Sequence, residues 1–135
     1  MKRPLASLVF AVAILGALSA ALAANLKDEV KVEIESVGLH PGMDPGMYVC
    51  AGGHLHIKGT VQNLAGLPLG RIKVAGQAFD ADGKLRGTAM ASTKEDTLRP
   101  GEKAPIDLEF LTVTGPVIQI IKKHKVTVIE APTKQ

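Results

Sequence analysis

Side chains that bind soft metal ions gather in one short segment of the 135-residue chain. Residues 40–56 contain three of the four histidines, two of the four methionines and the single cysteine. Thioether, thiolate and imidazole groups are ligands that copper prefers, and the sulfur donors favour cuprous copper. The segment therefore supports the hypothesis of a metal site with copper as its cofactor, as the alternative to a protein without a cofactor. The candidate ligands are His40, Met43, Met47, Cys50, His54 and His56.

Two histidines form the best-defined part of this candidate site. His54 and His56 are two residues apart in a segment where apolar and polar side chains alternate. Both rings should then point to one face of a strand, ~6.6 Å apart along it. The preceding residues are rich in Gly and Pro, so that they could fold Met43 or Met47 over the same point.

The same residues also have an interpretation without a metal. Met43 and Met47 would fill apolar gaps at the open end of the fold, and His54 and His56 would lie on the solvated face of a strand. Cys50 would be a small buried apolar residue, or would form a disulfide with another chain in an oxidising compartment. The spacing matches no paired C-x-x-C signature, and one cysteine excludes a disulfide framework.

The N-terminal residues have the features of a cleavable signal peptide. Lys2 and Arg3 make a basic start, residues 5–22 carry no charge, and Ala21-Leu22-Ala23 supplies the small residues that a signal peptidase requires. The alternative is an uncleaved membrane anchor, which is usually built from bulkier residues. We expect a signal peptide over residues 1–23, cut after Ala23.

Cleavage would leave one domain, residues 24–135, in the bacterial periplasm or outside the cell, with no membrane insertion. This domain has 14 basic residues against 13 acidic ones, so the basic character of the whole chain comes largely from the leader. Lys122-Lys123-His124-Lys125 is the remaining basic cluster, and it lacks aromatic neighbours on which bases could stack. We therefore expect no nucleic-acid partner.

The domain is patterned as strands. Apolar and polar residues alternate with a period of two in six or seven short segments, and Gly and Pro stand mainly between them. Tight turns are expected at residues 80–83 and 98–102. No segment has the pattern of an amphipathic helix. The fold class is all-β, an immunoglobulin-like antiparallel β-sandwich of about seven strands. The predicted strands cover residues 29–37, 55–62, 71–79, 84–93, 106–110, 117–121 and 125–129.

The order of strand ends and turns resembles the FxLYD family of bacterial secreted or periplasmic domains. The residues that carry the resemblance are Gly59-Thr60-Val61-Gln62-Asn63, Ala78-Phe79-Asp80, Asp82-Gly83-Lys84, Pro100-Gly101-Glu102 and Ile106. The similarity covers about residues 55–129. It departs from the family at the naming motif, where Gly76 to Asp80 lacks the first Phe and the Leu. The resemblance implies an immunoglobulin-like β-sandwich and an extracytoplasmic binding or accessory role, and it implies no active site.

Enzymatic activity has no support in the sequence. Ser36 and Ser92 are the serines of the domain, and neither lies in a G-x-S-x-G motif. Asp80-Ala81-Asp82-Gly83 lacks the later ligands of a calcium loop. We expect an exported non-enzymatic module that contacts another extracytoplasmic protein through a sheet face or edge. The alternative is a periplasmic copper-binding protein that uses residues 40–56. The sequence does not indicate an oligomeric state.

Overall fold

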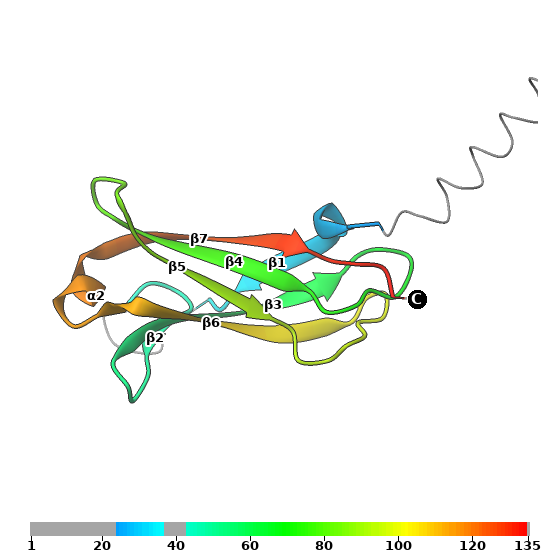
Figure 1. Cartoon of the computed structure of the whole chain (residues 1–135), viewed down its shortest axis with the longest axis horizontal. Helices are drawn as coiled ribbons and strands as arrows, with labels where there is room; N and C mark the ends of the chain where they lie inside the picture. The colour runs from blue at the N-terminus through cyan, green and yellow to red at the C-terminus, as the bar shows by residue number, and fades with distance from the viewer. Residues whose placement is uncertain (1–23, 37–42, 135) are drawn as a thin grey trace, which may run out of the picture.

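Two antiparallel sheets packed face to face make up the part of the chain that the computed structural model describes, residues 24–36 and 43–134 (Figure 1). The predicted all-β class and the seven strands of the sandwich are confirmed. The predicted signal peptide, residues 1–23, and the candidate ligand His40 lie outside the described residues. Neither described helix is long and apolar enough to cross a membrane.

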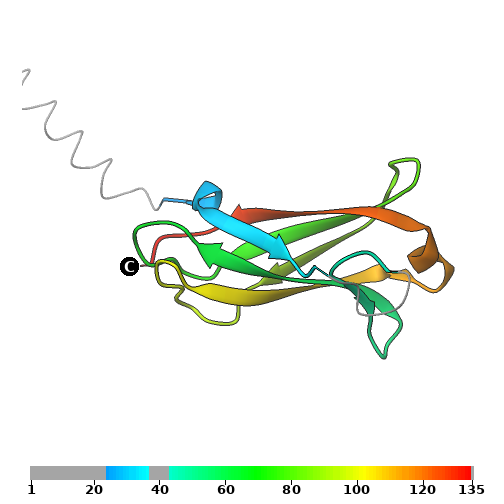
Figure 2. The ribbon, with the colours of Figure 1, turned by 180° about the vertical axis from the view of Figure 1, so that it is seen from behind.

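The first sheet carries the candidate site. It contains β1 (Val30–Ile34), β2 (Met47–Val49), β3 (His54–Asn63) and β6 (Lys103–Thr114), and the short 3-10 helix η1 (Lys27–Glu29) precedes it. β3 is the central strand, because β6 pairs along one of its edges while β1 and β2 pair along the other. The reverse view shows β1 alongside β3 (Figure 2).

The second sheet has β4 between two neighbours. Its strands are β4 (Lys73–Asp80), β5 (Leu85–Ser92) and β7 (Ile121–Glu130), in the order β5-β4-β7. The chain crosses from the first sheet to the second between β3 and β4, returns between β5 and β6, and crosses again through α2 (Pro116–Ile120).

The core lies between the sheets because alternate side chains of the central strands point inward. Every second residue of β3 and of β4 is buried, and β6 follows the same alternation over most of its length. Phe110 is fully buried, and the absence of a side chain at Gly76 makes room for it. A Cβ at Gly76 would lie 3.0 Å from Phe110 Cζ and 3.0 Å from Leu108 Cδ1. The outward positions of the same strands remain available for polar residues.

Two local predictions were wrong. Residues 117–121, predicted as a strand, form α2 up to Ile120, and β7 begins at Ile121. Gly115 turns the chain with φ +57°, and Pro116 takes the first helical turn, where its missing N–H costs nothing. Residues 47–49 form strand β2 in the Gly- and Pro-rich segment, where no strand was predicted.

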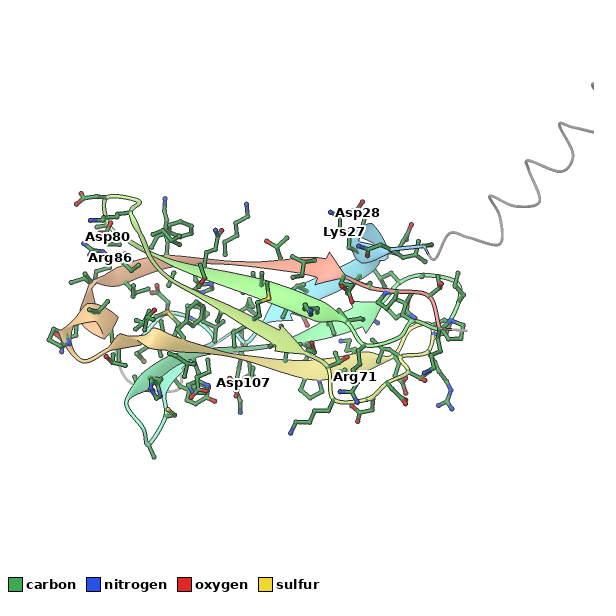
Figure 3. All side chains as sticks on the ribbon, viewed as in Figure 1. Lys27, Asp28, Arg71, Asp80, Arg86 and Asp107 are labelled. Carbon is green, nitrogen blue, oxygen red and sulfur yellow. The ribbon has the colours of Figure 1, made fainter. Side chains whose placement is uncertain are left out.

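The turn at residues 80–83 is present as predicted and is stabilised by a buried carboxylate. Asp80 Oδ1 accepts hydrogen bonds from the backbone N–H groups of Asp82 and Lys84, at 2.9 and 3.0 Å. Its Oδ2 accepts one from Arg86 Nε at 2.9 Å, and the two labelled side chains meet at this end of the sandwich (Figure 3). The backbone hydrogen bond from Lys84 lowers the pKa of Asp80, against the opposing effect of burial and with the help of Arg86. Asp80 therefore has a structural role, since its carboxylate stabilises the turn.

Candidate metal centre

Six polar side chains, five from strands β2, β3 and β6 and one from Cys50 directly after β2, share the outward face of the first sheet. Because side chains alternate along a strand, residues two apart point to the same side. This relation joins Tyr48 with Cys50, His54 with His56, and Asp107 with Glu109. In the strand register, His56 is directly opposite Tyr48 of β2 and directly opposite Glu109 of β6, so it is the centre of the group. The six residues, Tyr48, Cys50, His54, His56, Asp107 and Glu109, are called the outward cluster below.

The turn between β2 and β3 places Cys50 beside His54. The backbone N–H of Cys50 donates to the carbonyl oxygen of His54 at 3.1 Å, and that of Gly53 donates to the carbonyl of Cys50 at 2.9 Å. Gly53 has φ +83°, a conformation that residues with a side chain rarely adopt. The absence of a side chain at Gly52 makes room for the thiol and the ring. A Cβ there would lie 3.3 Å from His54 Nδ1 and 3.7 Å from Cys50 Sγ.

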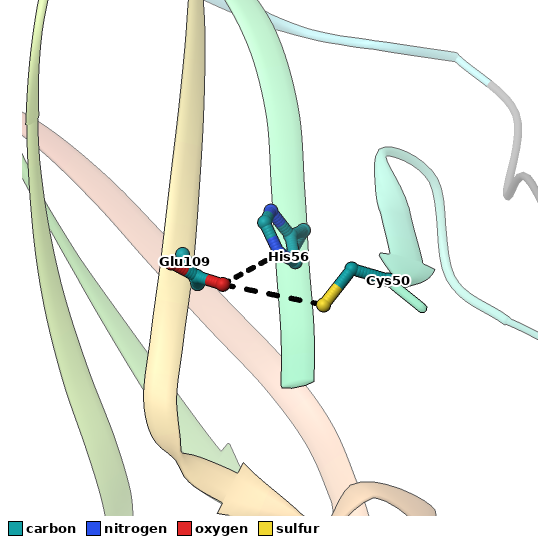
Figure 4. Close-up of side chains that lie close together, drawn as sticks. All are labelled: Cys50, His56 and Glu109. Atoms are coloured by element: carbon teal, nitrogen blue, oxygen red, sulfur yellow. Dashed lines mark hydrogen bonds and ion pairs between the residues drawn. The ribbon is translucent and has the colours of Figure 1, made fainter. Parts of the chain in front are cut away.

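Three donor atoms of the outward cluster, from Cys50, His56 and Glu109, are spaced like the ligands of one metal ion (Figure 4). Glu109 Oε2 lies 3.4 Å from His54 Nδ1, 3.3 Å from His56 Nε2 and 4.0 Å from Cys50 Sγ. Cys50 Sγ lies 3.7 Å from His54 Nδ1, and donor atoms of Cys50, His56 and Glu109 all lie within 4.8 Å of one another. Zinc bonds of 2.0–2.3 Å in a tetrahedron require ligand-to-ligand distances of ~3.3–3.8 Å. The separations of 3.3, 3.4 and 3.7 Å lie within that range, and the Cys50–Glu109 separation of 4.0 Å lies just above it.

The remaining two residues of the outward cluster hold the His56 ring. His56 Nδ1 lies 2.8 Å from Asp107 Oδ1, and the Tyr48 hydroxyl donates to Asp107 Oδ2 at 2.5 Å. The rings of Tyr48 and His56 stack with centroids 4.6 Å apart and planes 29° apart. Lys58 Nζ lies 5.5 Å from the centroid of the Tyr48 ring, within the range of a cation–π contact.

The protonation equilibria of the outward cluster are shifted. The backbone N–H of His54 lowers the pKa of Cys50 from 9.0 to about 6, against the opposing effect of burial and with the help of the His54 and His56 rings. Burial by itself would lower the pKa of His56, but the hydrogen bond to Asp107 and the nearby negative charges of Asp107 and Cys50 outweigh it, and the pKa is raised. Burial raises the pKa of Tyr48, and the hydrogen bond to Asp107 adds to that effect. A thiolate is therefore accessible at neutral pH.

One buried nitrogen of the outward cluster lacks a hydrogen-bond partner among the described residues. His56 Nε2 is buried and makes no hydrogen bond to any residue that the structure describes. It lies 3.3 Å from Glu109 Oε2, close enough for charge interaction but without the orientation of a hydrogen bond. The His56 side chain is only 12% exposed, and a buried polar atom without a partner is unfavourable. A cation between Nε2, Glu109 and Cys50 would satisfy it.

The structure brings together some of the sequence-predicted ligands and places others elsewhere. Cys50, His54 and His56 converge, and both histidines face Glu109 as expected for residues two apart. Met47 is buried in the core because it pairs with Ile57, an inward-facing residue. Met43 packs against the same core. The methionines thus contribute to packing, as the interpretation without a metal expected of them, and not to the outward cluster.

Sequence reasoning missed Glu109, Asp107 and Tyr48. The two carboxylates were interpreted as solvated residues on the outward face of a strand. Asp107 does lie on that face (Figure 3), and its side chain is 40% exposed. A signal was available, since Asp107-Leu108-Glu109 repeats the polar–apolar–polar spacing of His54-Leu55-His56. Using it requires the knowledge that β3 pairs with β6, some 50 residues later.

Comparison with known proteins gives one structural likeness. No family model and no curated protein matches the chain, so the resemblance to the FxLYD family is not confirmed. The chain is similar to the crystal structure of a DUF1425 family member from Shewanella sp. pv-4, with 16% sequence identity and a TM-score of 0.41. The match covers 77% of this chain and 99% of that one. A likeness of this size carries no inference about function.

Proposed function

We propose that this protein is a metal-binding module that holds one transition-metal ion between Cys50, His54, His56 and Glu109. The observation that carries the proposal is the spacing of the donor atoms: those of Cys50, His56 and Glu109 all lie within 4.8 Å of one another, and His54 Nδ1 lies close to Cys50 and Glu109. Three measured separations centre on Glu109 Oε2, at 3.3, 3.4 and 4.0 Å, and the Cys50–His54 separation is 3.7 Å. The buried Nε2 of His56, which makes no hydrogen bond within the described part of the chain and faces Glu109 Oε2 at 3.3 Å, is a second observation in its support.

The donor set favours a divalent ion of borderline softness. One thiolate, two imidazoles and one carboxylate are ligands that Zn²⁺ accepts in tetrahedral geometry, and a thiolate with two imidazoles also suits copper. The sequence-based preference for cuprous copper depended partly on thioethers, and Met43 and Met47 pack into the core instead. A carboxylate oxygen takes their place in the donor set, so we propose Zn²⁺ or Cu²⁺ as the bound ion.

Four protein ligands leave no vacant coordination position, which is typical of a structural or storage site and unlike a catalytic one. Glu109 and His54 are 44% and 29% exposed, so an ion can enter from solvent at this side of the site. The proposal is compatible with an exported, non-enzymatic accessory module. Export to the periplasm and contact with a protein partner stay predictions from the sequence.

The test is a titration of the purified protein with Zn²⁺ against a chromophoric chelator, under reducing conditions. We expect one ion per chain. The variants Cys50→Ser, His56→Ala and Glu109→Gln should each lower the affinity at least ~10-fold, since each removes a donor. His124→Ala, which removes a histidine of β7 outside the outward cluster, is the matched control and should leave the affinity unchanged. The proposal fails if the ligand variants bind as tightly as the control.

A further inference from the structure

We infer that Asp107 and Tyr48 are positioning residues that hold the proton of the His56 ring on Nδ1, so that Nε2 is the metal-binding atom. This inference rests on the proposed function and concerns how the site is made ready for an ion. A neutral imidazole carries one proton, and the partner of one ring nitrogen decides which nitrogen keeps its lone pair. The partners on both sides of the His56 ring are therefore the relevant observations.

Both groups that face Nδ1 are acceptors. The Asp107 carboxylate has no proton to donate, and its Oδ1 lies 2.8 Å from Nδ1. The Tyr48 hydroxyl has a single proton, which is directed at Asp107 Oδ2 at 2.5 Å. Its oxygen, 3.0 Å from Nδ1, is then also available as an acceptor. A lone pair on Nδ1 would face two oxygens, so the proton belongs on Nδ1.

The groups around Nε2 are consistent with a proton on Nδ1 and a free lone pair on Nε2. Nε2 faces Glu109 Oε2 at 3.3 Å without hydrogen-bond geometry, and Cys50 supplies a sulfur on the same side. A lone pair beside a carboxylate and a thiolate is repelled by both unless a cation lies between them. The ring is thus oriented with its free lone pair toward the place where the negative groups converge.

Tyr48 also fixes the plane of the ring. It stacks on His56 at a centroid distance of 4.6 Å, while its hydroxyl contacts Asp107 and its ring lies under Lys58 Nζ. Partners of this kind, which orient a ligating histidine without touching the metal, typically change metal affinity 10- to 100-fold when they are mutated. Asp107 and Tyr48 are expected to have an effect of this size although neither donates to the ion.

The first measurement reports the tautomer without any metal. The ¹⁵N chemical shifts of the His56 ring, recorded on the metal-free protein at a pH where the ring is neutral, distinguish a protonated nitrogen from one with a free lone pair. We expect Nδ1 to be protonated and Nε2 to be free in the wild type. In Asp107→Asn, a substantial population with the proton on Nε2 should appear. A wild type with the proton on Nε2 would overturn the inference, whatever the result of metal titration.

The second measurement is the Zn²⁺ affinity of the same proteins. Asp107→Asn should bind ~10- to 100-fold more weakly than the wild type, and Tyr48→Phe, which keeps the stacked ring, should lose less than ~10-fold. Asp96→Asn makes the same chemical change at an exposed position and should leave affinity unchanged. Loss of affinity in Asp107→Asn with an unaltered tautomer would overturn the inference, because the carboxylate would then act by charge alone. If the tautomer is as expected but neither the wild type nor any variant binds Zn²⁺ or Cu²⁺, the orientation by Asp107 and Tyr48 stands and the proposed function fails.

Discussion

Gly52 offers a way to disturb the candidate site without changing any donor atom. A Cβ at this position would lie 3.3 Å from His54 Nδ1, 3.4 Å from His54 Cε1 and 3.7 Å from Cys50 Sγ. Gly52 does not have a positive φ, so Gly52→Ala introduces a methyl group without backbone strain. In the metal-free protein the ring has only to shift by a few tenths of an ångström. When an ion is bound, His54 Nδ1 must stay ~2.0–2.1 Å from it, and the methyl group competes for that space.

The expected loss follows from one misplaced ligand. Disturbing the orientation of a ligating histidine typically lowers metal affinity 10- to 100-fold, or ~1.4–2.8 kcal/mol at 1.4 kcal/mol per factor of ten. The free energy of unfolding of the metal-free protein should change by less than ~1 kcal/mol, because an exposed Gly→Ala substitution without strain is close to neutral or mildly stabilising.

The assay is a double-mutant cycle with His54→Ala, measured by Zn²⁺ competition. Because the methyl group acts through His54, Gly52→Ala should have little further effect in the His54→Ala background. Gly66→Ala is the matched control, since Gly66 is also exposed and a Cβ there would meet nothing within 4 Å. The reasoning is refuted if Gly52→Ala and Gly66→Ala bind Zn²⁺ equally, or if the effect of Gly52→Ala is undiminished without the His54 ring.

Three further predictions concern pH and the sandwich. Zn²⁺ affinity, measured by competition across pH, should fall as pH drops, first because His56, whose pKa is raised above 6.5, takes up a proton and then, through about 6, because Cys50 does. An affinity that is flat across this range would exclude the thiolate as a ligand. Phe110→Ala should lower the free energy of unfolding, measured with urea, by ~3–5 kcal/mol, because Phe110 is fully buried; a loss below ~1 kcal/mol would contradict the packing. Asn63→Ala should cost ~1–3 kcal/mol in the same assay, because it leaves the Ala65 N–H without its acceptor and removes the hydrogen bonds to the Leu67 and Leu98 carbonyls, of which Leu98 keeps the one from the Leu69 N–H; a neutral effect would show that these hydrogen bonds do not stabilise the fold.

Strong alternation made most of the sandwich predictable. The runs in β3, β4 and β6 have one apolar face each, and the observed burial alternates accordingly over β3 and most of β6. In β4 the burial alternates too, but at its end Asp80 is buried and Phe79 is only partly buried. Residues 117–120 were mispredicted as strand because a short apolar run is compatible with either a strand or a helix, and Pro116 and Gly115 decide between them. The three-residue strand β2 was too short to show a period.

The candidate site was predictable only within the segment that contains Cys50, His54 and His56. His54 and His56 are two residues apart on a strand, so their side chains point to the same face. This rule can be applied without knowing the fold. Glu109 lies at the site because β6 pairs with β3, which is distant in sequence. Met47 lies in the core and not at the site because it pairs with Ile57. No local sequence pattern predicts either position. The metal that the donor set favours therefore depends on tertiary structure.

X-ray absorption at the zinc edge of the Zn²⁺-loaded protein tests the central claim most directly. The proposed ligands predict one sulfur at ~2.3 Å and three nitrogen or oxygen atoms at ~2.0–2.2 Å, with the sulfur signal lost in Cys50→Ser. A spectrum with only nitrogen and oxygen neighbours, or with a sulfur signal that survives Cys50→Ser, would contradict a site built from Cys50, His54, His56 and Glu109.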